Sequence, residues 1–198
     1  MAHDAAPAAP RARDAEATQQ AILEAAVAAF ARHGYDGAST REIAREAGVD
    51  ARLVTRYFGS KERLFERAVE RTYEHPLMMV PGQNRDVAVA LLSDAPLSQS
   101  QGLLLTLRSA SNDRAAAIMR AHLESHYQKE LADGLDGPNP VARAALLISI
   151  CAGVQLLRNV LDIRALQAGD TEALADQLAA ALDAVAAPAP SKPRRTAR

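Results

Sequence analysis

Residues 39–61, STREIAREAGVDARLVTRYFGSK, concentrate side chains whose chemistry suits contact with DNA. An arginine guanidinium can make a bidentate contact with O6 and N7 of a guanine. Hydroxyl and ammonium groups, and backbone amides at helix N-termini, can contact phosphate. The side chains that would contact bases are Arg41, Ala51, Arg52, Thr55 and Arg56. Those that would contact phosphate are Thr40, Tyr57 and Lys61. The first group would specify a sequence and the second would position the protein on it.

A simpler interpretation is that the arginines only solvate a polar surface, on which Arg45, Glu42 and Glu46 form ordinary surface pairs. That interpretation leaves unexplained why three helix starts follow one another so closely. Ser39 and Glu42 have the S-x-x-E spacing of a capping box, in which each side chain bonds a free backbone amide of the first turn. Asp50 and Ser60 are further N-cap residues, and the glycines before them can end the preceding helices. The spacing predicts helices at about 40–47, 51–58 and 61–75.

Such short helices are not stable alone in water, so they must pack on a partner. The preceding helix, at about residues 15–33, offers an apolar stripe: Ile22, Leu23, Ala26, Val27 and Phe30. The apolar residues expected to converge on it are Ile43, Ala44, Ala47, Val49, Val54 and Phe58. Two short helices joined by a tight turn containing glycine form a helix-turn-helix, whose second helix enters the major groove.

The segment YDGASTREIAREAGVDARLVTRYFGSKERLF, with the amphipathic helix before it, resembles the N-terminal DNA-binding domain of the TetR/AcrR family of bacterial transcriptional regulators. The resemblance covers about residues 15–70 and rests on the glycines, the apolar positions, the pair Tyr57-Phe58 and Lys61, which recur in order. It implies that an all-α ligand-binding and dimerisation domain follows.

Carried over position by position, the resemblance implies phosphate contacts near Thr40, Tyr57 and Lys61. The base contacts that it implies come from Arg41, Ala51 and Arg52, with Thr55 close by. Many members have a small or hydroxylic residue followed by Leu-Tyr where this chain has Leu53, Val54 and Thr55. This departure leaves the role of Thr55 open.

The composition fits an all-α chain. The 198 residues are 48% hydrophobic and only 4% aromatic, and strong helix formers dominate. A formal net charge of −1 argues against a protein that coats nucleic acid by bulk charge, although a local basic face remains possible. The N-terminus lacks the apolar stretch of a secretory signal, and the apolar run at 144–157 is shorter than the roughly 18 residues of a membrane span. We therefore expect a cytoplasmic protein.

About nine helices are expected in four parts. Residues 1–13 and 188–198 would be disordered tails, the second of them basic. Residues 14–60 would form the helix-turn-helix domain and residues 61–187 the ligand-binding and dimerisation domain. The helices expected in the latter, beyond the one at 61–75, span about 84–94, 97–110, 113–133, 140–157 and a last stretch from 171.

The second domain offers weaker signals for a ligand site. Residues expected to line an effector pocket are Met78, Met79, Leu104, Leu107, Met119, Leu123 and His126. His122, His126 and Glu130 are spaced i, i+4, i+8 on one helical face. That face would line an effector pocket, bind a metal, or simply be solvated or part of an interface. We expect no metal and no cofactor.

The helix from Pro140 is apolar on nearly every side, so it needs partners beyond its own domain. With the last helix it would form a four-helix interface across a twofold axis, through Leu147, Ile150, Cys151, Val154, Leu174, Leu178 and Leu182. Cys151 stands alone in the sequence and is expected to be a small buried hydrophobe.

The function that these patterns favour is a homodimeric transcriptional regulator. The resemblance to the TetR/AcrR family implies that it is a repressor, because most members block transcription by occupying an operator. It would bind a palindromic operator and be released by a small-molecule effector. The chain shows no nucleophile motif, phosphate-binding glycine loop or zinc signature, so it is not expected to be an enzyme. The alternatives are a helical protein-interaction module and, less favoured, a metal-dependent all-α enzyme using the histidine face.

Overall fold

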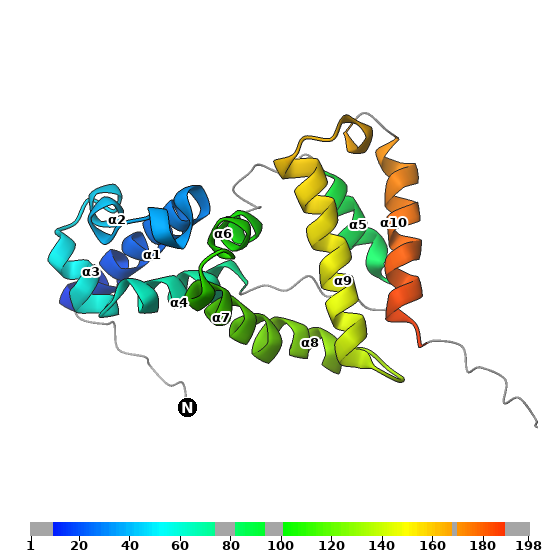
Figure 1. Cartoon of the computed structure of the whole chain (residues 1–198), viewed down its shortest axis with the longest axis horizontal. Coiled ribbons are helices and arrows are strands. Elements are labelled where there is room, and N and C mark those ends of the chain that lie inside the picture. The colour runs from blue at the N-terminus through cyan, green and yellow to red at the C-terminus, as the bar shows by residue number, and fades with distance from the viewer. Residues whose placement is uncertain (1–9, 74–81, 94–100, 168–169, 189–198) are drawn as a thin grey trace, which may run out of the picture. The chain divides into compact units, whose positions relative to one another are not determined.

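The computed structural model describes residues 10–73, 82–93, 101–167 and 170–188. Every regular element in these ranges is a helix, which confirms the all-α prediction (Figure 1). The chain packs as two compact units. The first comprises residues 1–74 and 104–119, and the second comprises residues 75–103 and 120–198.

The first unit contains α1 (Pro10–Gly37), α2 (Thr40–Glu46), α3 (Ala51–Phe58) and α4 (Lys61–Thr72), with most of α6 (Gln101–Ser109) and α7 (Asp113–His122). The helices α2, α3 and α4 begin at the predicted residues. The helix α1 begins at Pro10, within the stretch 1–13 that the sequence analysis assigns to a tail. Proline is favoured in the first turn of a helix, and the alanines and arginines that follow are good helix formers.

The core of the first unit is the one that the apolar pattern predicts. Ile22, Ala26 and Phe30 are fully buried on α1. The residues of α2 to α4 buried in the same cluster are Ile43, Ala44, Val54, Leu64, Phe65, Ala68 and Val69. The Phe30 and Phe65 rings meet edge to face with their centroids 5.0 Å apart, a favoured aromatic geometry. Short helices that are marginal alone are thus held by a shared apolar core.

The second unit contains α5 (Asn84–Leu92), a π-helical turn at Leu123–Tyr127, α8 (Gln128–Asp133), α9 (Pro140–Gln155) and α10 (Thr171–Ala186). A second π-helical turn (Leu156–Val160) and a 3₁₀ turn (Arg164–Leu166) follow α9. Figure 1 shows α5, α9 and α10 side by side, and each packs against the other two. The predicted helix at 113–133 is present as α7, the π-helical turn and α8.

Polar contacts fix the elements of the second unit at defined positions. The buried Asn84 side chain donates to Asp183 at 2.6 Å, and the backbone amide of Gly82 donates to the same oxygen at 2.8 Å. The buried guanidinium of Arg143 donates to the carbonyls of Ala186, at 2.8 Å, and Asp136. The bonds to Asp183 and Ala186 join the start of α5 and the start of α9 to the last turn of α10. The two carbonyls that accept from Arg143 compensate part of the cost of burying its charge.

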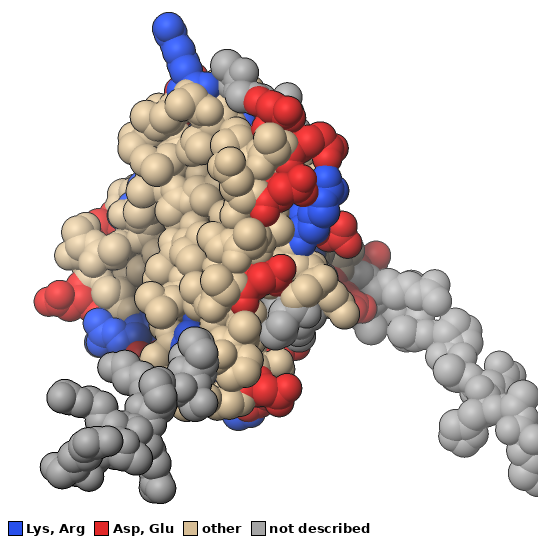
Figure 2. Space-filling model, turned by 90° about the vertical axis from the view of Figure 1, so that its right-hand side faces the viewer, with Lys and Arg blue, Asp and Glu red and all other residues tan. Residues whose placement is uncertain are grey.

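The helix at 140–160 is longer than its predicted apolar run, because the π-helical turn extends α9 without a break. By length and composition alone it could cross a membrane, with a mean hydropathy of 1.8 in its most apolar window, of which 17% is buried. Two buried arginines, Arg143 and Arg158, lie within it. Its exposed apolar residues are Val141 and Leu146, with Leu157 in the π-helical turn. Figure 2 shows the broad uncharged face of this unit, bordered on one side by acidic side chains.

Gly34 interrupts α1 in a conformation that only glycine adopts readily, with φ 69° and ψ 179°. A Cβ atom at this position would lie 2.3 Å from the carbonyl oxygen of Arg108. Gly48 also has a positive φ, of 68°, but no heavy atom lies within 4 Å of where its Cβ would be. A residue with a Cβ atom would strain the backbone at either position. It would also clash with a neighbouring atom at position 34, but not at position 48.

We therefore expect Gly34→Ala to lower the free energy of unfolding by about 3 kcal/mol or more. The matched variant Gly48→Ala should lower it by only about 1 kcal/mol, the cost of a left-handed residue. Urea denaturation of the purified proteins measures both losses. Equal losses would contradict the close packing of Gly34 against α6.

Candidate nucleic-acid interface

Three side chains cap the three helices that carry the predicted DNA contacts. The Ser39 hydroxyl accepts from the amide of Glu42 at 3.1 Å, Asp50 accepts from the amide of Arg52 at 2.8 Å, and Ser60 accepts from the amide of Arg63 at 3.1 Å. All three predicted N-caps are confirmed. The capping box is only half formed, since the Glu42 carboxylate lies 3.5 Å from Nε2 of His33.

The eight predicted DNA-contact residues fall into the two groups that the sequence separates. The proposed base readers are all exposed: Arg41, Ala51, Arg52, Thr55 and Arg56. The proposed phosphate contacts are all half-buried: Thr40, Tyr57 and Lys61. The first group is open to solvent, while the second is held closer to the helix framework.

Arg52 is fixed by the residue that caps its helix. Its Nε donates to Oδ1 of Asp50 at 3.1 Å and its Nη2 donates to Oδ2 at 3.2 Å. These hydrogen bonds hold the pKa of the Asp50 carboxyl below its usual value and raise the pKa of the guanidinium. The sequence indicates Asp50 only as a cap, so this second contact is an addition from the structure.

Lys61 is held at the start of α4 by two contacts. Its Nζ lies 4.8 Å from the centroid of the Tyr35 ring, within the range of a cation–π interaction. The same atom donates to the carbonyl of Asp36 at 3.5 Å. Partial burial lowers the pKa of Lys61, and the negative charge of Asp36 opposes that shift. These two contacts hold the ammonium in one orientation.

Residues distant in sequence hold the loop before α2. The buried hydroxyl of Ser109 accepts from the amide of Tyr35 at 3.0 Å. The side-chain amide of Asn112 donates to the carboxylate of Asp36 at 2.9 Å. The turn between α6 and α7 thus fixes the backbone that leads into the first helix of the motif.

Two arginines extend this support along α1 and α4. The Arg108 guanidinium donates to the carbonyl of Ala31, and the Arg114 guanidinium pairs with Glu62 in the first turn of α4. Hydrogen bonding to Glu62 raises the pKa of Arg114. No local sequence pattern indicates these pairs, because the partners are 77 and 52 residues apart. Helical periodicity reports only which face of a helix is buried, not which distant residue it meets.

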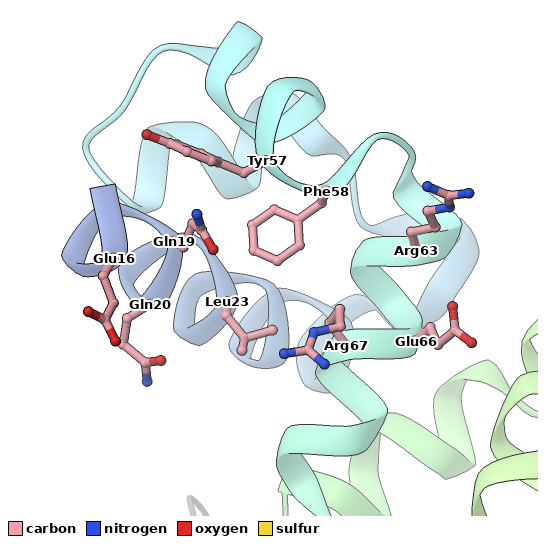
Figure 3. A pocket seen from close by; sticks show the side chains of 9 residues that line it. All are labelled: Glu16, Gln19, Gln20, Leu23, Tyr57, Phe58, Arg63, Glu66 and Arg67. Atoms are coloured by element: carbon pink, nitrogen blue, oxygen red, sulfur yellow. The ribbon is translucent and has the colours of Figure 1, made fainter. Parts of the chain in front are cut away.

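An open hollow of about 470 Å³ lies among α1, α3 and α4 and was not predicted. Figure 3 shows the Phe58 ring at its centre, above Leu23, with polar side chains around it. These polar side chains are Glu16, Gln19, Gln20, Tyr57, Arg63, Glu66 and Arg67. Both signs of charge line the hollow, so it has no clear preference for an anion or a cation.

The predicted effector-pocket residues are distributed over both units. Met78 and Met79 lie outside the described residues. Leu104 and Met119 pack in the core of the first unit. Leu107 belongs to the same unit but is 44% exposed. Leu123 is half-buried and His126 exposed in the second unit. A pocket lined by the whole set stays a prediction.

The histidine face is formed in part. The His122 and His126 rings stack with centroids 4.8 Å apart, and Ser125 hydrogen-bonds to Nδ1 of His126 at 2.8 Å. Both rings lie at the π-helical turn, a local distortion that often occurs at functional sites. Within the described residues no cluster of three metal-binding side chains is found.

The residues predicted for a dimer interface face mainly inward. Leu147, Cys151 and Leu182 are buried in the core of the second unit. The other four are half-buried against the same core or its neighbour: Ile150, Val154, Leu174 and Leu178. The stripe that the sequence predicts for an interface is thus one that packs within the second unit. Burial raises the pKa of the Cys151 thiol to about 11, which fits the predicted inert, hydrophobic role.

Two known protein families match the chain, one in each part. The family described as bacterial regulatory proteins, tetR family, matches residues 22–68. A tetracyclin repressor-like C-terminal domain matches residues 85–185. The chain belongs to the TetR family. The resemblance read from residues 15–70 is confirmed, and the TetR match extends through the second unit.

Similar proteins are named as transcriptional repressors or regulators. The HTH-type transcriptional repressor SCO4008 of Streptomyces coelicolor is 35% identical over 129 residues, which are 64% of this chain and 67% of that protein. The HTH-type transcriptional regulatory protein RaaS of Mycobacterium tuberculosis is 53% identical over 53 residues, which are 26% of this chain and 24% of that protein. The protein is therefore a DNA-binding transcriptional regulator.

Solved structures support the same fold. The SCO4942 protein of Streptomyces coelicolor is 27% identical, with a TM-score of 0.59 over 84% of this chain and 96% of that chain. A transcriptional regulator from Rhodococcus sp. Rha1, RHA1_ro04179, is 23% identical, with a TM-score of 0.58 over 84% of this chain and 94% of that chain. Both structures share the fold of this chain over most of its length.

The caps give a direct test of how the motif is held. Ser39→Ala removes the acceptor for the Glu42 amide and should lower the free energy of unfolding by about 0.5–2 kcal/mol. Ser39→Asn keeps an acceptor and should stay close to the wild type. Thermal and urea unfolding measure both variants, and an Asn variant as unstable as the Ala variant would argue against capping.

Proposed function

We propose that the protein is a homodimeric repressor that binds a palindromic operator and is released by a small-molecule effector. The observation that carries the DNA-binding part is the exposed polar face of α2 and α3, on which Arg41, Arg52 and Arg56 project from a capped and tightly packed framework. On this proposal α3 lies in the major groove. A cytoplasmic location follows from such a role.

The proposed contacts divide the work between bases and backbone. Arg41 and Arg52 are exposed at or near the start of their helices, where side chains can reach base edges. Lys61 and Tyr57 are half-buried beside the framework, which suits contacts to the phosphates along the groove. Because the formal net charge is −1, attraction to DNA must come from this local face rather than from the whole molecule.

The case for a dimer rests on exposed apolar side chains in the second unit. Val141 and Leu146 on α9 are 59% and 56% exposed, and Leu161 and Ile163 beyond it are 57% and 41% exposed. Together with Leu157 they belong to a unit with a broad uncharged face (Figure 2). Large apolar side chains exposed to water favour burial against a partner, and a second copy of the chain would cover these. Two copies related by a twofold axis would read half-sites about 34–36 Å apart, or a multiple of that.

Repression is proposed from the names of related proteins, and release by an effector is proposed from thermodynamic coupling between two binding sites. Repression is favoured because SCO4008 and further relatives, NicS of Pseudomonas putida and AcnR of Corynebacterium, are named transcriptional repressors. An effector that stabilises a conformer with wrongly spaced reading helices would lower DNA affinity by the coupling free energy between the two sites. An enzymatic role has no support from the relatives, whose names all denote regulators.

Fluorescence anisotropy tests the DNA-binding proposal on the duplex upstream of the protein's own gene, against a scrambled duplex of equal length. We expect tight, salt-sensitive and selective binding by the wild type. Arg52→Ala should lower the preference for the specific duplex by about 1–3 kcal/mol. Lys61→Ala should weaken binding to both duplexes alike and reduce the slope of log affinity against log salt concentration by about one.

A selection from randomised duplexes provides the control for a target elsewhere in the genome. The proposal would be wrong if the upstream and scrambled duplexes bound equally and no sequence were enriched in the selection.

The dimer proposal predicts that a charge on the exposed apolar face separates the protomers. Leu146→Glu should yield monomers in analytical ultracentrifugation, because it places a carboxylate in the proposed contact, while leaving the helical content unchanged. Gln19→Glu, which adds the same charge at an exposed position of the first unit, is the control and should remain dimeric. A Leu146→Glu protein that sediments as the wild type does would contradict this interface.

A further inference from the structure

The N-cap of α3 and the arginine two residues later form one unit. Asp50 accepts three hydrogen bonds from Arg52: from its amide at 2.8 Å, from Nε at 3.1 Å and from Nη2 at 3.2 Å. The Arg52 side chain is nevertheless 91% exposed, and that of Asp50 is 54% exposed. The pair therefore stands on the surface of α3, with the guanidinium open to a ligand.

The geometry leaves a specific part of the guanidinium free of Asp50. A guanidinium carries five N–H donors in a rigid plane. Asp50 accepts along the edge formed by Nε and Nη2. The neighbouring edge, which has one N–H of Nη1 and the second N–H of Nη2, points away from the carboxylate. That edge has the parallel pair of donors that matches O6 and N7 of a guanine.

We propose that Asp50 is a positioning residue that determines base specificity, because it holds the Arg52 guanidinium with its free edge ready to read a guanine in the major groove. This inference rests on the proposed function, in which α3 lies in that groove. It assigns to Asp50 a role beyond capping and to Arg52 a particular base.

Two physical effects make the pair more selective than a lone arginine. A free arginine side chain samples many rotamers and can turn to the nearest phosphate, whereas the hydrogen bonds to the Asp50 carboxylate reduce that freedom before binding. Its negative charge also repels phosphate and disfavours placing Arg52 against the backbone of the DNA. Because the hydrogen bonds from Arg52 hold the pKa of Asp50 below its usual value, the carboxylate stays charged throughout the neutral range.

The alternative is that Asp50 only caps α3. Asparagine and aspartate are equally good N-caps, so Asp50→Asn keeps the bond to the Arg52 amide. The neutral amide has a single acceptor oxygen and cannot accept from Nε and Nη2 as a charged bidentate partner. Asp50→Asn therefore separates the positioning of Arg52 from the capping of the helix.

The experiment selects binding sites from a randomised duplex library with wild type, Arg52→Ala, Asp50→Asn and the double variant. The guanine whose enrichment is lost with Arg52→Ala identifies the base that Arg52 reads. Anisotropy then compares the duplex carrying that guanine with duplexes carrying each other base at the same position, and with random DNA.

We expect wild-type discrimination at this base of roughly 5- to 150-fold, the range of a good bidentate contact. Asp50→Asn should reduce it by at least about 3-fold, and the double variant should match Arg52→Ala, as coupled residues do. Affinity of Asp50→Asn for random DNA should be unchanged or higher, since a negative charge is removed. A role in capping alone would leave discrimination intact.

The outcomes separate this inference from the function on which it rests. If the wild type enriches a motif and Asp50→Asn keeps full discrimination at the Arg52 base, the inference is overturned while the regulator proposal stands. If Arg52→Ala changes no base preference, Arg52 reads no base and the inference also fails. If the wild type enriches no sequence at all, both the proposal of sequence-specific binding and this inference are wrong.

Discussion

The packing of α2 and α3 against α1 is the constraint on which the rest of the structure depends. Helices of 7 and 8 residues are too short to persist in water, so their shape comes from the apolar core that they share with α1 and α4. Small residues let the helices approach closely, since Ala26 and Ala44 are almost completely buried between larger side chains. The framework that carries the predicted recognition residues is therefore built on apolar contacts.

Hydrogen bonds then convert this packing into a defined orientation. The caps fix where each helix begins, and the turn between α6 and α7 holds the loop that enters α2 through Ser109 and Asn112. Lys61 and Arg52 are each restrained before DNA is present, one by an aromatic ring and a carbonyl, the other by Asp50. Preorganisation of this kind lowers the entropy lost on binding.

The first unit could be predicted from sequence because its signals are local. Capping residues, turn glycines and an apolar stripe each act within a few residues, and Ser39, Asp50 and Ile43 lie as their patterns predict. The second unit was harder, because α9 is apolar on every side and periodicity could not tell the side that packs on α10 from the side left exposed. Leu147 was therefore chosen for an interface and lies in the core, while Leu146, next to it, is exposed. The supports from Arg108 and Arg114 join residues so far apart that no local pattern reports them.

The first unit is built from two separate stretches of the chain, so its N-terminal stretch cannot be exchanged without losing contacts to the other. The first unit is assembled from residues 1–74 and 104–119, so the polypeptide leaves it, returns and leaves again. A recombination event that transferred only the first 74 residues to another regulator would leave Ser109, Arg108 and Arg114 behind. Their replacements would have to supply the same bonds to Tyr35, Ala31 and Glu62. Point substitutions on the exposed faces of α2 and α3 would leave these supporting bonds in place, whereas exchange of the whole N-terminal segment would not.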